Sequence, residues 1–259
     1  GKTKHKTLVD QFAYPLQGTG MVYERMEKFV NEHGGKVHLN TAIKKVNCKN
    51  GTVNSIQLAD GTVQEFDHVI SSMPITHLVN NMDEVPEEVI EANSSLKFRN
   101  TILVYLRVDR PDLFTDQWLY IHDQSVSFGR VTNFRNWIPS IYGDSNASIL
   151  CMEYWCNFED EDWEKDDNYY VELARNELVY TGLADSADIL EGKVIKIPRS
   201  YPVYFNHYKE FIKPVQEYLD EIDNLHVIGR YGAYKYNNQD HSIFMGLLAA
   251  ENILDQKNH

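Results

Sequence analysis

The chain has 259 residues, of which 42% are apolar and 24% charged, and its net charge is −13. This length and composition are typical of a folded protein of one or two domains and exclude a disordered or fibrous chain. The acidic balance argues against nonspecific binding to nucleic acid or to an anionic membrane. Apolar runs are too short for a membrane-spanning helix, so we expect no integral membrane segment.

The first part of the chain predicts one helix followed by several short strands. Apolar residues recur on one face of residues 20–33, after a glycine turn and before Gly34 and Gly35, which predicts a helix. Asn50-Gly51 and Asp60-Gly61 each separate alternating runs, a pattern typical of tight hairpins. The expected strands are 36–40, the members of a meander at about 42–48, 52–58 and 62–66, and a buried strand at 68–73.

The middle of the chain predicts several strands with helices attached. An acidic run at 159–167 is expected to be a solvated loop that leads into a helix, whose positive end suits acidic residues. The expected helices are 85–96 and 168–183. The expected strands are 100–108, 118–123, 127–134, 148–155 and 193–204, the last broken by Pro198 and Pro202.

The end of the chain predicts a buried strand, a glycine-containing loop and a helix. The strand ends at Gly229, where the backbone can approach a ligand closely, and Gly232 follows. A polar loop then offers Asp240 or Ser242 as the N-cap of a helix that ends near Leu254. By pattern alone, a capped helix beside a surface loop and a ligand site are equally good interpretations. Mixed strands and helices with antiparallel signals predict an α/β fold of the mixed, α+β kind.

Cysteine and histidine usage gives two further expectations. Cys48, Cys151 and Cys156 form no Cys-x-x-Cys pair, which favours buried thiols and a reducing, cytoplasmic location. His122 and His241 have no second ligand at a metal-binding spacing. We therefore expect no metal site.

The sequence GRYGAYKYNNQDHSIFMGLLAAENI, at 229–253, resembles the C-terminal FAD-binding signature of a flavoprotein superfamily. This superfamily contains amine oxidases, protoporphyrinogen oxidases and UDP-galactopyranose mutases, and the resemblance is greatest to the protoporphyrinogen oxidase-like and mutase-like branch. FAYPLQGTGMVYERM at 12–26, GGKVHLNTAIKKV at 34–46 and DHVISSMPI at 67–75 resemble other segments of the same proteins. The resemblance therefore covers nearly the whole chain.

The resemblance implies that the chain takes part in binding FAD. It implies that Gly229 and Arg230 lie against the pyrophosphate and ribityl chain, and that Val46 contributes backbone contacts near the adenine. It also implies that the last helix directs its positive end at the flavin ring and stabilises the anionic reduced form. The residues implied at that helix start are Asn238, Gln239, Asp240, His241 and Ser242.

For the substrate, the mutase-like positions are Asn136, Arg199, Tyr201 and Tyr236. In mutases the corresponding arginine and tyrosine residues hold a nucleotide-sugar pyrophosphate, a task that suits a guanidinium fork and hydroxyl groups. Ordinary aromatic packing stays open for the two tyrosines, and a surface or ion-pair role for the arginine. The arginines that favour a nucleotide sugar are Arg99, Arg107, Arg130, Arg135 and Arg199.

The resemblance divides the chain into three segments. Residues 1–78 are expected to be the second part of a partial FAD/NAD(P)-binding domain, 79–218 a substrate domain with a largely antiparallel sheet, and 219–259 a C-terminal FAD-binding segment. The Gly-x-Gly-x-x-Gly turn that binds the dinucleotide pyrophosphate is absent from the sequence. We therefore expect a fragment of a larger flavoprotein, which alone binds FAD weakly and does not turn over.

Three hypotheses for function follow. The leading one is a FAD-dependent oxidoreductase that oxidises a small-molecule substrate by hydride transfer to flavin N5. The first alternative is a mutase-like flavoenzyme that acts on a nucleotide sugar with no net redox change. The second alternative is a non-catalytic binding domain with a decayed cofactor site.

Overall fold

The protein is described by a computed structural model of residues 13–255, which form two compact units. The first, here called the sheet unit, contains the described residues up to His38 together with Ile102–Trp155 and Glu164–Ile195. The second, here called the mixed unit, contains Leu39–Thr101, Cys156–Trp163 and the described residues from Lys196 onward. These units group the chain differently from the three predicted segments, and the roles given to those segments remain predictions.

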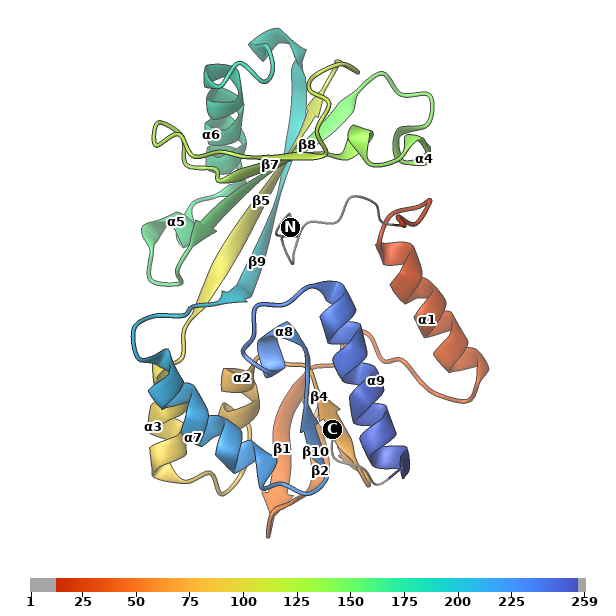
Figure 1. The fold of residues 1–259 in the computed structure, drawn as a ribbon, viewed down its shortest axis with the longest axis vertical. Helices are drawn as coiled ribbons and strands as arrows, with labels where there is room; N and C mark the ends of the chain where they lie inside the picture. The colour runs from red at the N-terminus through yellow and green to blue at the C-terminus, as the bar shows by residue number, and fades with distance from the viewer. Residues whose placement is uncertain (1–12, 256–259) are drawn as a thin grey trace, which may run out of the picture. The chain divides into compact units, whose positions relative to one another are not determined.

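A five-stranded sheet runs through the sheet unit in the order β6-β7-β8-β5-β9, which Figure 1 draws from yellow to cyan. Strand β6 pairs antiparallel with β7, and β7 pairs antiparallel with β8, so the antiparallel prediction is confirmed for this part. Strands β5 and β9 also contribute residues to the mixed unit. The strand bounds are β5 Phe98–Val108, β6 Trp118–Tyr120, β7 Arg130–Asn133, β8 Ser148–Cys156 and β9 Ile189–Pro202.

Helix α6 (Asp167–Tyr180) buries its inner face in the sheet unit. The buried residues are Tyr170, Ala174, Glu177 and Leu178, at the spacing of one helix face. The carboxylate of Glu177 accepts hydrogen bonds from the Ser127 amide (2.7 Å) and the Tyr154 hydroxyl (2.9 Å). Burial, with the neighbouring Glu177 carboxylate, raises the pKa of Tyr154. The hydroxyl is therefore a permanent donor that joins α6 to β8.

Helix α1 (Gly20–Glu32) confirms the first predicted helix, but none of its residues is buried. The segment before it is held within the sheet unit by two contacts. The ring of Tyr14 lies 4.9 Å from that of Trp137, and the Ser140 hydroxyl donates to the Leu16 carbonyl at 2.5 Å. The remaining short helical segments of this unit are Phe134–Asn136, α4 (Pro139–Tyr142) and Ser186–Asp188.

The mixed unit contains the predicted meander of β1 (Ile43–Lys49), β2 (Thr52–Leu58) and β3 (Val63–Glu65). Asn50 and Gly51 have φ of +53° and +73°, as a two-residue turn with both residues left-handed requires. The strand predicted at 36–40 is wrong. That segment has no regular structure and ends at Asn40, whose φ is +55°, because its alternating apolar residues are exposed and have no buried face to line.

Strand β4 (Val69–Ser71) pairs in parallel with β10 (Leu225–Val227), so segments far apart in sequence meet in one small sheet. The core beside this sheet is formed by helices that Figure 1 shows in the same unit: α2 (Ile75–Asn80), α3 (Glu87–Ser95) and α7 (Tyr208–Asp220). The sequence interpretation missed α2 and α7. In α7 the buried Ile212, Val215 and Leu219 have helical spacing, but Pro214 lies among them and weakens the signal.

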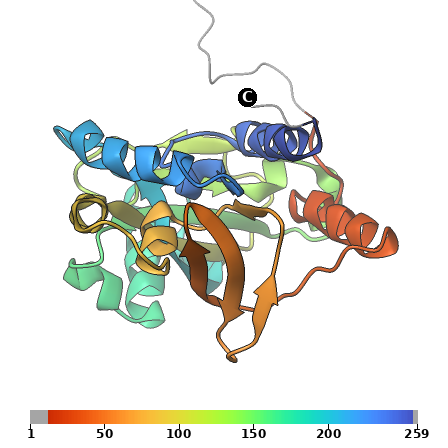
Figure 2. The same ribbon diagram turned by 90° about the horizontal axis from the view of Figure 1, so that it is seen from below.

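The chain closes with α8 (Gly229–Gly232) and α9 (Gln239–Asp255), and α5 (Glu161–Glu164) completes the helices of the described residues. In Figure 2 the blue helices α7 and α9 lie on one side of the mixed unit and the orange meander extends from it. Helix α9 begins three residues earlier than predicted, so Asp240 and Ser242 lie in its first turn and the N-cap prediction is wrong. Across residues 13–255, no helix is long and apolar enough to cross a membrane.

Candidate functional site

Strands β4 and β10 end at the same edge of their parallel sheet, and glycines allow the backbone to come close there. Gly229 has φ of +78°, and a Cβ atom on it would lie 3.7 Å from the Ser72 Cβ. A Cβ on Gly232 would lie 3.1 Å from both the Ser71 carbonyl oxygen and the Val227 Cγ1. Ligands of open parallel sheets bind beyond the carboxyl ends of the strands, so this edge is a candidate cofactor site.

Ser71 supplies an unexplained polar group at this edge. Its carbonyl accepts the Ile228 amide at 2.9 Å, but its buried hydroxyl has no hydrogen-bond partner among the described residues. A buried hydroxyl without a partner is costly, and a bound polar group or water would satisfy it. The sequence interpretation missed this residue. The signal was the pair of serines at the end of a buried strand, shortly before Pro74.

We expect Gly232→Ala to lower the free energy of unfolding by about 1–3 kcal/mol, because the added methyl group would lie 3.1 Å from a backbone oxygen and from a packed side chain, closer than carbon atoms usually come. Urea titration followed by circular dichroism measures this loss. Gly20→Ala, at a glycine with no atom within 4 Å of the added Cβ, is the matched control and should be near neutral. Equal stability of the two variants would contradict the close approach at Gly232.

Arg230, Tyr201 and Tyr236 form one cluster, here called the arginine–tyrosine cluster. The two tyrosine rings stack at 5.7 Å, and the Arg230 guanidinium carbon lies 5.1 Å from the Tyr201 ring centre and 4.6 Å from that of Tyr236. Nε and Nη2 of Arg230 donate to the Asn237 carbonyl at 3.1 and 2.5 Å. The guanidinium is thus fixed by stacking and by a forked hydrogen bond, which leaves its other N–H groups for a ligand.

Tyr234 anchors the start of the loop that leads from α8 to α9. This residue has φ of +51°, and its buried hydroxyl donates to the Lys97 carbonyl at 2.7 Å. Burial raises the pKa of Tyr234 to about 12. The Tyr236 amide donates to the Tyr204 hydroxyl at 2.7 Å. These bonds fix the backbone that carries Tyr236 into the cluster.

The predicted flavin-ring residues lie together at the start of α9. Asn238, Gln239, Asp240 and His241 are exposed, and Ser242 is half-buried. The Ser242 hydroxyl donates to the Asn237 side-chain carbonyl at 3.2 Å, and the Asp240 carboxylate lies 3.1 Å from the His241 ring. The structure therefore presents a polar helix start beside the arginine–tyrosine cluster along the chain.

Three other predicted site residues lie elsewhere in their units. Val46 is buried in β1 and its amide donates to the Asn81 carbonyl at 2.7 Å. Asn136, in the sheet unit, donates from its amide group to the carbonyls of Phe114 and Asp116. Arg199 is left-handed, with φ of +53°, and its guanidinium stacks over Phe158 at 4.8 Å. Strand β9 continues through Pro198, so the break predicted there is wrong, and it ends at Pro202, the second proline predicted to break it.

Three of the other arginines that favoured a nucleotide sugar have protein partners. Arg107 pairs with Glu191 at 3.1 Å, and Arg130 makes a two-pronged contact with the buried Glu153. Arg135 donates to the carbonyls of Ser145 and Ala147, and lies over the Tyr142 ring. These contacts give each guanidinium a local structural partner.

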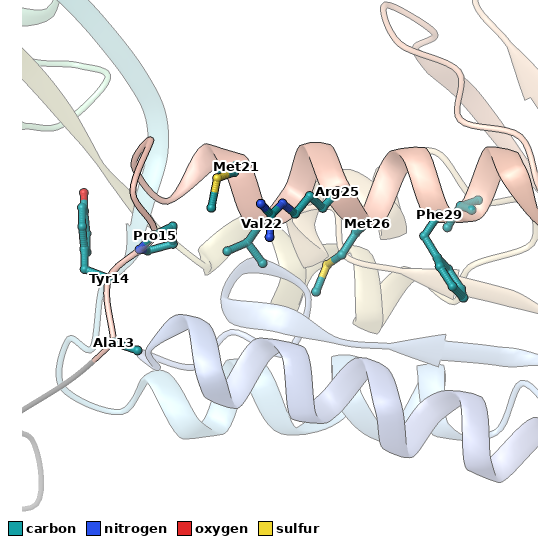
Figure 3. Close-up of a pocket in the computed structure, with 9 residues that line it drawn as sticks. Ala13, Tyr14, Pro15, Met21, Val22, Arg25, Met26 and Phe29 are labelled. Carbon is teal, nitrogen blue, oxygen red and sulfur yellow. The ribbon is translucent and has the colours of Figure 1, made fainter. Parts of the chain in front are cut away.

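An apolar hollow of about 830 Å³ lies along α1, and Figure 3 shows the side chains of Met21, Val22, Met26 and Phe29 along the helix with Tyr14 at one end. Arg25 is the one charged residue among the described residues that line it. These described lining residues include no acid or imidazole, and only Tyr14 has a hydroxyl, so they offer binding area and no catalytic group. No cluster of three potential metal ligands occurs among the described residues.

Comparison with known proteins identifies the class of the chain. The sequence model of the family described as "Flavin containing amine oxidoreductase" matches residues 4–254. The chain belongs to this family. The resemblance noted from the sequence is therefore confirmed.

Individual relatives agree with the family and the fold. The chain is similar to the 15-cis-phytoene desaturase of Glycine max, with 25% identity, over 87% of this chain and 40% of that protein. A crystal structure of reduced UDP-galactopyranose mutase superposes with a TM-score of 0.82 at 20% identity, over 95% of this chain and 54% of the mutase. The structure of a provisionally assigned protoporphyrinogen oxidase of Exiguobacterium sp. 255-15 superposes with a TM-score of 0.68 at 14% identity, over 93% of this chain and 53% of that protein. The chain thus spans about half the length of these relatives or less.

The described residues fit a flavin at the edge of the parallel sheet. The glycine backbone at Gly229 can approach a pyrophosphate closely, and the Ser71 hydroxyl lacks a partner there among the described residues. The first turn of α9 adds backbone N–H groups, whose partial positive charge suits an anionic flavin ring. These are general features of dinucleotide sites, so the donor set fits the cofactor of the family.

Proposed function

We propose that the chain is part of a FAD-dependent oxidoreductase acting on a small-molecule substrate. The observation that carries the proposal is the family match across residues 4–254. The flavin, when bound, would supply a hydride acceptor for oxidation of the substrate. Because the chain spans only part of its relatives, activity belongs to the longest polypeptide that contains it.

The chain's own residues would hold the cofactor and the substrate. Gly229 would allow close backbone approach to the pyrophosphate, and the Ser71 hydroxyl would donate to a cofactor oxygen. The first turn of α9 would stabilise negative charge at the ring through its unpaired amides. The arginine–tyrosine cluster would bind an anionic or aromatic part of the substrate.

The flavin is tested by purifying both this chain and the longest polypeptide that contains it. We expect a flavin absorbance spectrum from the longer protein, and mass spectrometry of the extracted cofactor distinguishes FAD from other flavins. Weak binding or none is expected for the isolated chain. A longer protein that binds no flavin would favour instead a non-catalytic binding domain with a decayed site.

A second candidate is a mutase-like flavoenzyme that acts on a nucleotide sugar. Two stacked tyrosines beside a fixed guanidinium favour it, because hydroxyl groups and a planar fork suit a pyrophosphate. Incubation of the dithionite-reduced protein with a UDP-sugar separates the candidates, since only the mutase candidate predicts a flavin–sugar adduct.

Arg230→Lys is expected to weaken nucleotide-sugar binding by the longer protein about 10- to 100-fold, because lysine cannot keep both the stacking and the fork. Isothermal titration calorimetry with UDP and a UDP-sugar measures the change. Arg110→Lys, at an exposed arginine that pairs with Asp185 and Asp188 in the sheet unit, is the matched control and should bind as the unaltered protein does. Unchanged affinity in Arg230→Lys would remove the cluster from the substrate site.

We also propose a reducing, cytoplasmic location. It is supported by the three cysteines, Cys48, Cys151 and Cys156, which are buried as free thiols. Burial raises the pKa of the Cys151 thiol to about 12, so this thiol stays protonated and unreactive.

A further inference from the structure

A polar hollow of about 380 Å³ lies in the mixed unit, beside the ends of α2 and α3. Its wall includes His77 and Asn80 of α2, Lys97, the loop around Phe158, and Arg199 of β9. It shares no lining residue with the arginine–tyrosine cluster or with the edge of the parallel sheet. The proposed function therefore makes no use of the hollow, although the resemblance implied a substrate role for one of its lining residues, Arg199.

The hollow carries cationic groups that the described protein does not neutralise. Neither the Arg199 guanidinium nor the Lys97 ammonium has an ion pair or hydrogen bond among residues 13–255. Of the described residues that line the hollow, Glu159 alone carries a carboxylate. In a chain with 38 acidic and 25 basic residues, two unpaired cations at one hollow are a local reversal of charge.

Arg199 is held at the hollow in an unfavourable backbone conformation. Its φ of +53° is rare for a residue other than glycine, asparagine or aspartate. Its amide donates to the side chain of the buried Asn100 at 2.9 Å, which holds the backbone there, and its guanidinium carbon lies 4.8 Å from the Phe158 ring centre. Backbone strain of this kind persists where the surrounding structure imposes it, and it is concentrated at functional sites.

The amides of α2 and α3 also have fixed directions. The buried Asn93 donates from its Nδ2 to the Asn80 Oδ1 at 2.9 Å and to the Thr76 carbonyl at 3.2 Å. Because Asn80 accepts with its oxygen, its own Nδ2 is left as a donor at the hollow. The wall thus combines two cations, an oriented amide donor and an aromatic face.

We propose that this hollow binds the phosphoryl group of a small metabolite through Arg199, Lys97 and the Asn80 amide. A planar guanidinium and an ammonium are the side chains that bind phosphate oxygens best. The volume exceeds that of a phosphate ion and falls in the range of small-ligand sites, which leaves room for a sugar-sized remainder against Phe158.

The test is isothermal titration calorimetry of the flavin-free chain with inorganic phosphate and with glucose 6-phosphate. We expect both to bind, and to bind more weakly at high salt. Tighter binding of glucose 6-phosphate identifies a phosphorylated metabolite as the ligand, and equal binding identifies the inorganic ion. Because no flavin is needed, failure here leaves the proposed function untouched.

Arg199→Asn is the decisive variant, because asparagine tolerates the left-handed conformation better than arginine. We expect the melting temperature to stay equal or to rise, and phosphate affinity to fall about 10- to 100-fold. Arg110→Asn, at an exposed arginine of the sheet unit, removes the same charge and should leave affinity unchanged. Unchanged affinity in a folded Arg199→Asn protein, or an equal loss in Arg110→Asn, would overturn the proposal.

Two further variants are expected to change the phosphate affinity in opposite directions. Lys97→Gln should weaken phosphate binding, whereas Glu159→Gln should strengthen it by removing a like charge from the wall. Burial, and then the Arg199 charge, lower the pKa of His77, which lines the hollow together with Arg199, Lys97 and Glu159. Bound phosphate should raise that pKa, as followed by NMR of the imidazole. No rise on addition of phosphate would count against occupation of the hollow.

Discussion

Asn224→Leu is expected to lower the free energy of unfolding by about 3–5 kcal/mol, because it leaves buried backbone groups without partners. The Asn224 side chain accepts from the Val53 amide at 2.8 Å and donates to the Val53 carbonyl at 2.8 Å and the Asp67 carbonyl at 3.0 Å. Its own carbonyl accepts the Val69 amide at 2.8 Å. One side chain therefore joins β2 of the meander to the start of β4 and of β10.

Denaturant titration measures this loss, with Asn54→Leu as the matched control. Asn54 is exposed on the same strand β2 as Val53, and the control should change stability by less than about 0.5 kcal/mol. Asn224→Asp separates shape from hydrogen bonding, since it keeps the acceptor for the Val53 amide and loses both donors. A leucine variant as stable as the control would show that the meander does not depend on this clamp.

Arg130→Met is expected to destabilise the sheet unit by about 3–5 kcal/mol at pH 7, because it leaves Glu153 as a buried and unpaired carboxylate. Nε and Nη2 of Arg130 contact the two oxygens of Glu153 at 2.6 and 2.7 Å. Arg107→Met, which breaks the exposed pair with Glu191, is the control and should cost less than about 1 kcal/mol. The double variant Arg130→Met/Glu153→Met should recover most of the lost stability.

The loss in Arg130→Met should depend on pH. Burial raises the pKa of Glu153, and Arg130 opposes that rise, so removal of the arginine raises the pKa further. A carboxyl group whose pKa is higher in the folded than in the unfolded state favours folding below its unfolded pKa. That contribution is lost as the pH rises through the folded pKa. Arg130→Met should therefore be closer to the unaltered protein at pH 5 than at pH 7, and a loss independent of pH would contradict this account.

Local signals in the sequence predicted the hairpins and the long strands well. Asn50 and Gly51 adopt the left-handed conformations that their turn requires, and α1 begins at Gly20 as its glycine turn indicates. Failures occurred where tertiary contacts override local pattern. The alternation at 36–40 has no buried face to form against, and α7 tolerates Pro214 because its apolar face is buried in the core.

The candidate site was predictable in part. Residues close in sequence, such as Asn238 and Ser242, lie together because one helix start carries them. The stacking of Tyr201 on Tyr236 joins distant segments, and spacing alone could not predict it. Arg199 and Tyr201 are two residues apart in one strand, yet only Arg199 is among the residues that line the hollow, and its left-handed backbone is a conformation that residue spacing does not reveal.

The exposure of α9 has a consequence for how binding and folding are linked. Of its residues, only Ala249 is buried, while Ile243, Phe244, Leu247 and Leu254 remain exposed. Undocking this helix loses little buried area, so its opening free energy lies well below that of the strands in the core. A ligand bound at its first turn would raise the free energy of this local opening by its binding free energy. By thermodynamic reciprocity, docking of the helix would strengthen binding of the ligand by the same amount.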